Sequence, residues 1–142
     1  MPRDLDEPIP EDEALYRGLH PDHFEGQVVL PAAIDSQGTS VNRHKYNPDP
    51  QAAISKTRGE TGVASVCVRN FPAPLKTTSG SVFKFRADDR PTEENPAHAE
   101  IGVEKDSTPV GRIKNPVYRS QLKALLADKM RVLPTAPATS SL

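Results

Sequence analysis

The sequence predicts a small α+β domain, with a mainly antiparallel sheet of about four to six short strands and one C-terminal amphipathic helix. The length of 142 residues is that of a single domain. Several segments alternate apolar and polar residues with the period of a strand, whereas one segment near the end has the period of a helix. The 15 prolines keep most elements short.

The first half of the chain indicates short elements. Residues 14–19 are the first segment with buried character, and residues 27–30 form an apolar run that ends at Pro31. Residues 47–50 break regular structure. Asp49 can cap a short helix over 51–56, with Pro50 at its first position and Gly59 as its stop.

The second half contains the clearest patterns. Residues 62–68 are small and apolar on both faces, which predicts a central strand, and residues 81–87 and 98–104 alternate as half-buried strands. Asn115 and Pro116 can start a helix whose apolar stripe consists of Tyr118, Leu122, Leu125, Leu126 and Met130. Pro134 prevents its continuation. We therefore expect one domain over 14–133.

Charge is unevenly distributed. Residues 1–13 hold six acidic side chains and one basic one, a net charge of −5, whereas the remainder is +4. We expect an acidic, disordered leader over 1–13 and a flexible tail over 134–142.

The sequence contains one cysteine, Cys67, which excludes an intrachain disulfide and any zinc site built on several cysteines. No apolar run approaches the ~20 residues of a membrane span, and the chain starts with acidic residues instead of a secretion signal. These features predict a cytoplasmic, bacterial protein without membrane contact.

A histidine and a glutamate stand two residues apart in the predicted strand 98–104. His98 and Glu100 would lie about 6.5–7 Å apart on one face, where they can serve as a general base with its orienting carboxylate or as two metal ligands. The His-x-Glu spacing resembles that of zinc-dependent deaminases, but their downstream Pro-Cys-x-x-Cys is missing, so no metal site is predicted. The alternative is a polar strand face with His98 bonded to a loop carbonyl.

Two further clusters suggest anion binding. Arg17 can clamp a phosphate or carboxylate, and His20 and His23 beside it can act as an acid/base pair. Alternatively, they form a solvated loop.

Downstream, a small hydroxyl turn precedes basic residues, which suits a phosphate or a nucleic-acid backbone. Ser40, Arg43 and Lys45 are the candidate ligands there. Residues 41–90 carry nine basic and four acidic side chains. Alternatively, these basic side chains form an ordinary solvated surface that binds no ligand.

The arrangement Tyr16-Arg17-Gly18, Thr39-Ser40 and Glu100 resembles ADP-ribosyltransferases. This resemblance implies that Arg17 and Ser40 hold nicotinamide dinucleotide and that Glu100 orients the attacked ribose. Two departures are the short spacing between Arg17 and Ser40 and the presence of His98, where that family has Gln or Glu.

The pieces LYR, HPDHF, SV, GVA and NPAHAEI, between residues 15 and 101, also resemble a group of short bacterial proteins to which no activity is attached. This second resemblance implies no mechanism, but it suggests that the regions of Arg17, His20 and His98 belong to one module.

Three functions follow as hypotheses. The first is an accessory or interaction module of a multi-gene system, whose partner is another protein. The second is a small hydrolase or transferase that acts on a phosphate-bearing or nucleotide substrate, with Arg17 as anion clamp, His20 or His98 as acid/base and Glu100 as orienting carboxylate. The third is a nucleic-acid-binding protein that uses the basic 41–90 surface. The sequence identifies no cofactor.

Overall fold

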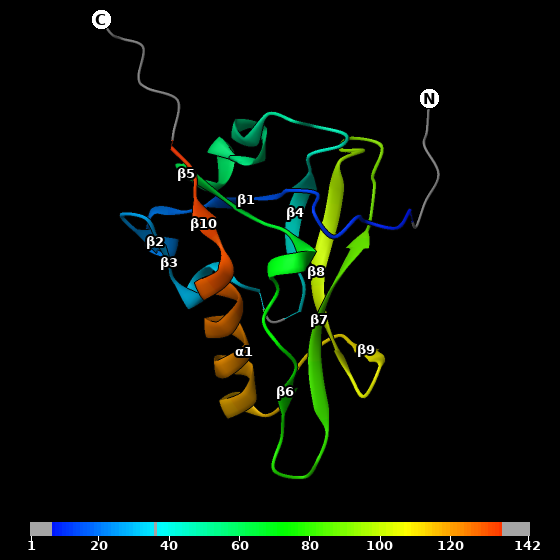
Figure 1. Cartoon of the computed structure of the whole chain (residues 1–142). Coiled ribbons are helices and arrows are strands. Elements are labelled where there is room, and N and C mark those ends of the chain that lie inside the picture. The colour runs from blue at the N-terminus through cyan, green and yellow to red at the C-terminus, as the bar shows by residue number, and fades with distance from the viewer. Residues whose placement is uncertain (1–6, 36, 135–142) are drawn as a thin grey trace, which may run out of the picture.

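A curled antiparallel sheet of eight strands organises the molecule (Figure 1). The computed structural model describes residues 7–35 and 37–134. The sheet order is β10-β5-β1-β4-β8-β7-β6, with β9 paired to β8. Its strands are β1 (Leu15–Leu19), β4 (Thr39–Arg43), β5 (Gly62–Val66), β6 (Leu75–Lys76), β7 (Val82–Asp89), β8 (His98–Lys105), β9 (Thr108–Val110) and β10 (Arg131–Val132).

Short elements connect these strands. A small hairpin joins β2 (Phe24–Glu25) to β3 (Val28–Val29). Five 3₁₀ turns are η1 (Pro21–His23), η2 (Pro31–Ala33), η3 (Pro50–Ala53), η4 (Lys56–Arg58) and η5 (Val68–Asn70). The predicted helix over 51–56 is therefore a pair of 3₁₀ turns. The predicted cap and stop are nonetheless present. The Asp49 carboxylate accepts from the Gln51 N–H at 3.0 Å, and Gly59 ends η4 at φ 74°.

The long helix is α1 (Pro116–Lys129), and it packs against one face of the sheet (Figure 1). The Asn115 side chain caps it as predicted, accepting from the N–H groups of Val117 and Tyr118. Leu122 and Leu126 are buried in the core, whereas Leu125 is 37% exposed. The predicted stripe is thus confirmed except at Leu125. The main features of the predicted α+β fold are confirmed, although more strands form than expected.

The two faces of the sheet differ in polarity. One face joins the core through alternate residues of β1, β4, β7 and β8, among them Leu15, Val41, Phe85 and Ile101. Because side chains alternate along a strand, the residues between them point to the other face. That second face carries Ser40 on β4 and His98 on β8.

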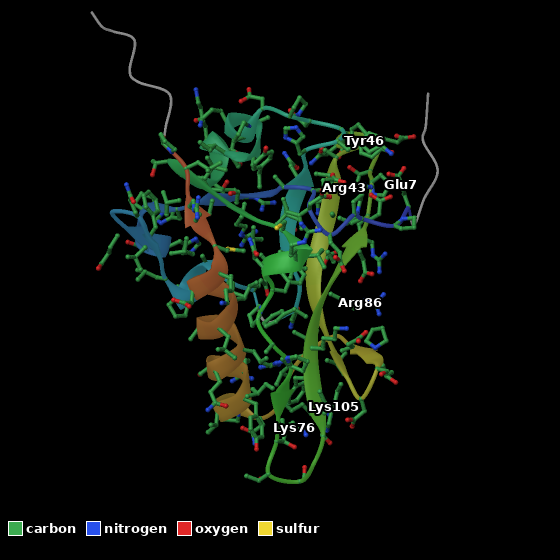
Figure 2. All side chains as sticks on the ribbon, viewed as in Figure 1. Glu7, Arg43, Tyr46, Lys76, Arg86 and Lys105 are labelled. Atoms are coloured by element: carbon green, nitrogen blue, oxygen red, sulfur yellow. The ribbon has the colours of Figure 1, made fainter. Side chains whose placement is uncertain are left out.

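Arg43 is a fully buried cation at the end of β4. Its guanidinium donates to Glu13 at 2.8 Å, to Glu7 at 3.1 Å and to Asp89 at 3.2 Å (Figure 2). Burial alone would lower the pKa of Arg43, but the hydrogen bonds to Glu13 and Asp89 outweigh it, and the net shift is upward. Arg43 is thus the centre of an internal charge cluster.

This cluster corrects two predictions. Glu7 and Glu13 contact the domain through Arg43, so residues 7–13 are held on the fold instead of forming a disordered leader. Lys45 also donates to Glu7, at 2.8 Å. Carboxylates of this chain therefore enclose the buried Arg43, and Lys45, which is 54% exposed, is paired with Glu7. The rest of the predicted leader, residues 1–6, and the tail from 135 lie outside the described residues.

Within the described ranges, no helix has the length and apolar character to cross a membrane.

Candidate functional site

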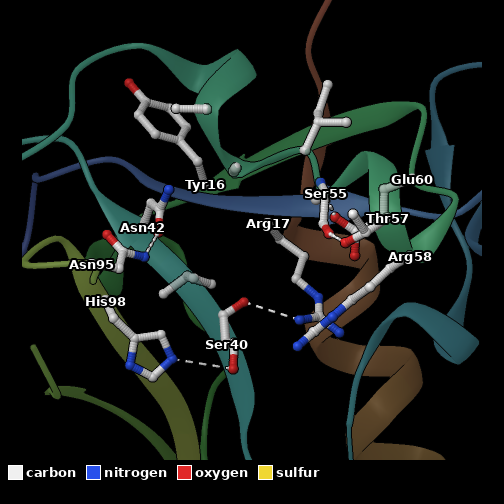
Figure 3. Close-up of a pocket in the computed structure, with 15 residues that line it drawn as sticks. Tyr16, Arg17, Ser40, Asn42, Ser55, Thr57, Arg58, Glu60, Asn95 and His98 are labelled. Carbon is white, nitrogen blue, oxygen red and sulfur yellow. Dashed lines mark hydrogen bonds between the residues drawn. The ribbon is translucent and has the colours of Figure 1, made fainter. Parts of the chain in front are cut away.

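A polar pocket of about 410 Å³ opens on the second face of the sheet, between β1, β4, the start of β8 and the 3₁₀ turns η3 and η4 (Figure 3). This volume falls in the range of roughly 300–1,000 Å³ that small ligands occupy. The labelled side chains of the pocket are Tyr16, Arg17, Ser40, Asn42, Ser55, Thr57, Arg58, Glu60, Asn95 and His98. Residues from three strands and two loops therefore meet here.

Arg17 reaches this pocket because β1 and β4 separate. The two strands pair only through Leu15 with Arg43 and Tyr16 with Asn42. Beyond Tyr16 the guanidinium of Arg17 lies between the strands, where Nη1 donates to the Ser40 carbonyl at 3.0 Å and Nε donates to the Ala33 carbonyl at 3.2 Å. These two bonds fix its orientation. Three of the five guanidinium N–H groups remain for a ligand.

The environment of Arg17 favours an added negative charge. Burial lowers the pKa of Arg17, and the neighbouring Arg58 lowers it further, whereas Glu60 and Asp35 oppose the shift. Among residues 7–35 and 37–134, no ion pair forms with Arg17 or Arg58. One oxygen of Glu60 accepts from the Ser55 N–H at 2.8 Å. Two guanidinium groups thus share a pocket that holds one carboxylate, already hydrogen-bonded.

His98 and Ser40 form a hydrogen-bonded pair across β8 and β4. His98 Nδ1 lies 2.7 Å from the Arg90 carbonyl, and Nε2 lies 3.3 Å from Ser40 Oγ. A carbonyl only accepts, so in the neutral imidazole Nδ1 carries the proton and Nε2 accepts from the Ser40 hydroxyl. The bond from His98 to a loop carbonyl, which the sequence suggested as the alternative, therefore forms with Arg90. It also leaves Nε2 as a base that faces the pocket.

Amide and aromatic groups form the other end of the pocket (Figure 3). The Asn95 side chain donates to the Asn42 side chain at 2.7 Å. Tyr16 is 6% exposed, and its hydroxyl lies 2.6 Å from His44 Nδ1. A ligand that extends from the guanidinium end to this end would meet both hydrogen-bonding amides and the side of an aromatic ring.

Gly18 lets the loop over the pocket approach β1. A Cβ at this position would collide with the Ala53 carbonyl and with the Glu60 carboxylate. The absence of a side chain therefore brings η3 and Glu60 against the strand, and this contact holds Ser55, Thr57 and Arg58 over the pocket.

We expect Gly18→Ala to destabilise the fold by about 1–3 kcal/mol, because a side chain there overpacks backbone that cannot move without displacing η3. Urea unfolding measures the effect. Gly102→Ala is the matched control, since a Cβ there meets nothing within 4 Å. Equal stabilities of the two variants would contradict the proposed close approach.

Several predicted site residues lie outside the pocket lining. Glu100 is opposite Ser40 in the strand register, and it contacts the Gly38 turn instead of the pocket. His20 caps η1, because its Nδ1 accepts from the Asp22 N–H at 3.1 Å. His23 stacks against His20, with ring centroids 5.7 Å apart.

Burial and Arg17 lower the pKa of His23, and its buried Nδ1 finds no hydrogen-bond partner among the described residues. The pocket therefore brings together Arg17, Ser40 and His98, without Glu100, His20, Arg43 or Lys45.

Sequence reasoning missed the loop residues Ser55, Thr57 and Arg58. Ser55 falls in the short helix predicted over 51–56, and Thr57 and Arg58 lie between that helix and its stop at Gly59. No local pattern could show that η3 and η4 fold over β1. Asn95 lay next to the His98 motif, but its contact with Asn42 joins residues 53 positions apart.

Among the described residues, part of the basic charge of the 41–90 surface is paired within the fold. Five of its nine cations form ion pairs with carboxylates of this chain, namely Arg43, Lys45, Arg69, Arg86 and Arg90. A nucleic acid would compete with these carboxylates for the five cations. In the part of the chain that the structure describes, no group of three or more His, Cys, Asp or Glu side chains could hold a metal ion.

No family model, curated protein or solved structure matches the chain. The chemistry of the pocket has to be inferred from the side chains that line it.

Proposed function

We propose that the protein binds a phosphate-bearing nucleotide in the Arg17 pocket and acts on it as a small hydrolase or transferase. The observation that carries the proposal is the pair of guanidinium groups, Arg17 and Arg58, with no ion pair among the described residues. Arginine presents a planar set of donors that matches phosphate oxygens two at a time. A phosphate between Arg17 and Arg58 would relieve the repulsion between the two cations.

The remaining lining suits the rest of a nucleotide. The Ser55 and Thr57 hydroxyls lie 3.1 Å apart beside Arg58 and can donate to further phosphate oxygens. The paired amides of Asn42 and Asn95 can recognise the polar edge of a base or a ribose hydroxyl. Since the lining is more polar than that of most small-molecule pockets, a polar ligand is favoured over an apolar one.

His98 supplies the acid/base chemistry in this proposal. The Arg90 carbonyl holds the Nδ1 proton, so Nε2 can take a proton from a hydroxyl or water that is positioned at Ser40. The guanidinium of Arg17 would stabilise negative charge that develops on the phosphate during transfer.

A narrower candidate is ADP-ribosyl transfer from nicotinamide dinucleotide. The favouring observation is that Arg17, Ser40 and Glu100 come from three neighbouring strands, β1, β4 and β8. In that resemblance Arg17 and Ser40 bind the dinucleotide and Glu100 orients the ribose. Glu100 would have to turn from Gly38 toward Ser40, its partner in the register.

Calorimetric titration tests the proposal, with adenosine, AMP, ADP, pyrophosphate and nicotinamide dinucleotide as probes. We expect the phosphate-bearing probes to bind and adenosine to bind at least about tenfold more weakly, because a charge-assisted hydrogen bond is worth about 1.5–3 kcal/mol. Arg58→Ala should weaken binding by about tenfold. Arg131→Ala is the matched control, because Arg131 is exposed on β10 and does not line the pocket.

Absence of binding by every phosphate-bearing probe at about 1 mM would overturn the proposal, and so would equal effects of Arg58→Ala and Arg131→Ala. Release of nicotinamide, abolished by Glu100→Gln, would support the narrower candidate. Binding of AMP and ADP without any nicotinamide release would support phosphate recognition and exclude ribosyl transfer.

A further inference from the structure

A second cavity of about 490 Å³ lies between the β6–β7 hairpin, β9 and the start of α1, and its lining is more apolar than that of the Arg17 pocket. Figure 2 labels Lys76 and Lys105 at this end of the molecule, away from Arg43 and Glu7. This second cavity shares no lining residue with the Arg17 pocket. We refer to it as the β7–α1 groove.

The floor of the groove is apolar and held in place. Phe83 and Ile113 are each 6% exposed, and Val110 and Tyr118 lie beside them in the lining. The Tyr118 hydroxyl accepts from the Thr78 N–H at 3.1 Å, which ties the hairpin to α1. The Phe83 and Tyr118 rings pack at 5.9 Å between centroids. A preformed apolar floor of this kind can bury one aliphatic side chain without rearrangement.

The rim of the groove carries uncompensated positive charge. Lys105, Arg112 and Lys114 are exposed and line the groove. Over the described ranges, none of the three forms an ion pair, whereas Arg43, Arg69 and Arg86 elsewhere do.

The nearest acidic side chains of the strand are already engaged. Glu104 bonds to Arg86 at 3.4 Å, and Asp106 accepts from the Val82 N–H at 2.9 Å. Among the described residues, the rim cations therefore have no carboxylate partner, and an acidic group of another molecule would complement them.

We propose that the β7–α1 groove docks an acidic segment of a partner protein, with one apolar side chain of that segment on the floor and its carboxylates paired with the rim. The apolar floor distinguishes this partner from a free anion, which needs no apolar contact. The packing of the floor favours a protein segment over a nucleic acid. Phe83 is 6% exposed, its ring is tilted against Tyr118, and Lys105 Nζ lies 6.0 Å from its centroid. The ring therefore offers little flat face for a base to stack on, whereas an aliphatic side chain needs only apolar contact.

The interaction does not depend on the nucleotide proposal, because the two sites have no residue in common. It gives the hypothesis of an interaction module a defined surface and a defined chemistry. Charge pairs at an exposed rim mainly accelerate association and set specificity, while the buried apolar anchor contributes most of the affinity.

The test uses the full chain labelled with ¹⁵N and a synthetic probe, an acetylated nine-residue peptide with one central leucine flanked by four glutamates on each side. We expect amide shifts confined to β6, β7, β9 and the start of α1. Replacing the central leucine with serine should weaken binding by about tenfold, because the buried aliphatic contact is lost. Arg112→Glu should weaken binding of the original peptide to a similar extent.

Lys56→Glu is the control variant, since Lys56 is exposed on η4 and lines neither site. It should change binding by less than about twofold. The proposal is overturned if the serine peptide binds as well as the leucine peptide, if Lys56→Glu and Arg112→Glu act equally, or if no shift occurs at about 1 mM peptide. A nine-nucleotide single strand that shifts the same amides more strongly would also overturn it, in favour of nucleic acid.

Discussion

Arg43→Met is expected to destabilise the fold by about 3–5 kcal/mol, because it removes the cation that the buried Asp89 and Glu13 carboxylates share. The Arg43 side chain and the Asp89 carboxylate are both 0% exposed, so Asp89 would keep a charge that water cannot reach. Glu13 is 8% exposed and would lose its bonds to the same guanidinium.

Chemical denaturation measures this loss. Arg86→Met is the matched control, because Arg86 also pairs with two carboxylates but is 36% exposed. Its removal should cost no more than about 1 kcal/mol. A similar loss from both variants would show that Arg43 acts as an ordinary surface cation.

The same cluster predicts the acid response of the protein. Hydrogen bonds from Lys45 and Tyr46 are the main causes that lower the pKa of Glu7 from 4.5 to about 2. A carboxylate with a lowered pKa in the folded state stabilises the fold above its ordinary pKa, and this contribution is lost as pH falls from about 4.5 to about 2. Glu7→Gln should therefore flatten the decline of stability over this window, as acid titration of the unfolding transition measures.

Arg17→Met is expected to weaken binding of AMP or ADP by about 100-fold, the loss of two charge-assisted hydrogen bonds to a phosphate. Arg17→Lys keeps the charge but not the planar pair of donors, so it should recover only part of the affinity. Calorimetric titration compares the two variants with the unchanged protein.

Binding and folding have to be separated in this experiment, because Arg17 also bonds to the carbonyls of Ala33 and Ser40. The unfolding transition of each variant is therefore measured beside its affinity. A folded Arg17→Met that binds AMP and ADP normally would overturn the role of Arg17 as the phosphate clamp. His98→Gln is a useful companion, because it should retain binding and lose turnover.

The elements that the sequence predicts well are those whose signals are local. The alternation in 81–87 and 98–104 predicted β7 and β8, since period two follows from the geometry of a strand itself. Asn115 and Pro116 predicted the start of α1, because a cap satisfies N–H groups within three residues. Asp49 and Gly59 were also assigned their local roles correctly, although the turns between them are 3₁₀.

Candidate residues were harder to interpret, because their residue type does not state their partner. Arg17 lies on β1 and Arg43 on the neighbouring strand β4, and the sequence suggested anion binding for both. Arg43 is surrounded by carboxylates from residues 7, 13 and 89. Within the part of the chain that the structure describes, Arg17 instead donates to two backbone carbonyls. The bacterial and cytoplasmic assignments and the resemblance to short bacterial proteins stay predictions.

The sequence by itself determined the longer strands and the long helix with its cap, because each depends on neighbours a few positions away. Only the tertiary structure decided which cations are paired and which face a cavity. Asp89 meets Arg43 from 46 residues away, and Ser40 meets His98 from 58 residues away. Such contacts are set by the order of strands in the sheet, and a pattern of period two or 3.6 contains no information about that order.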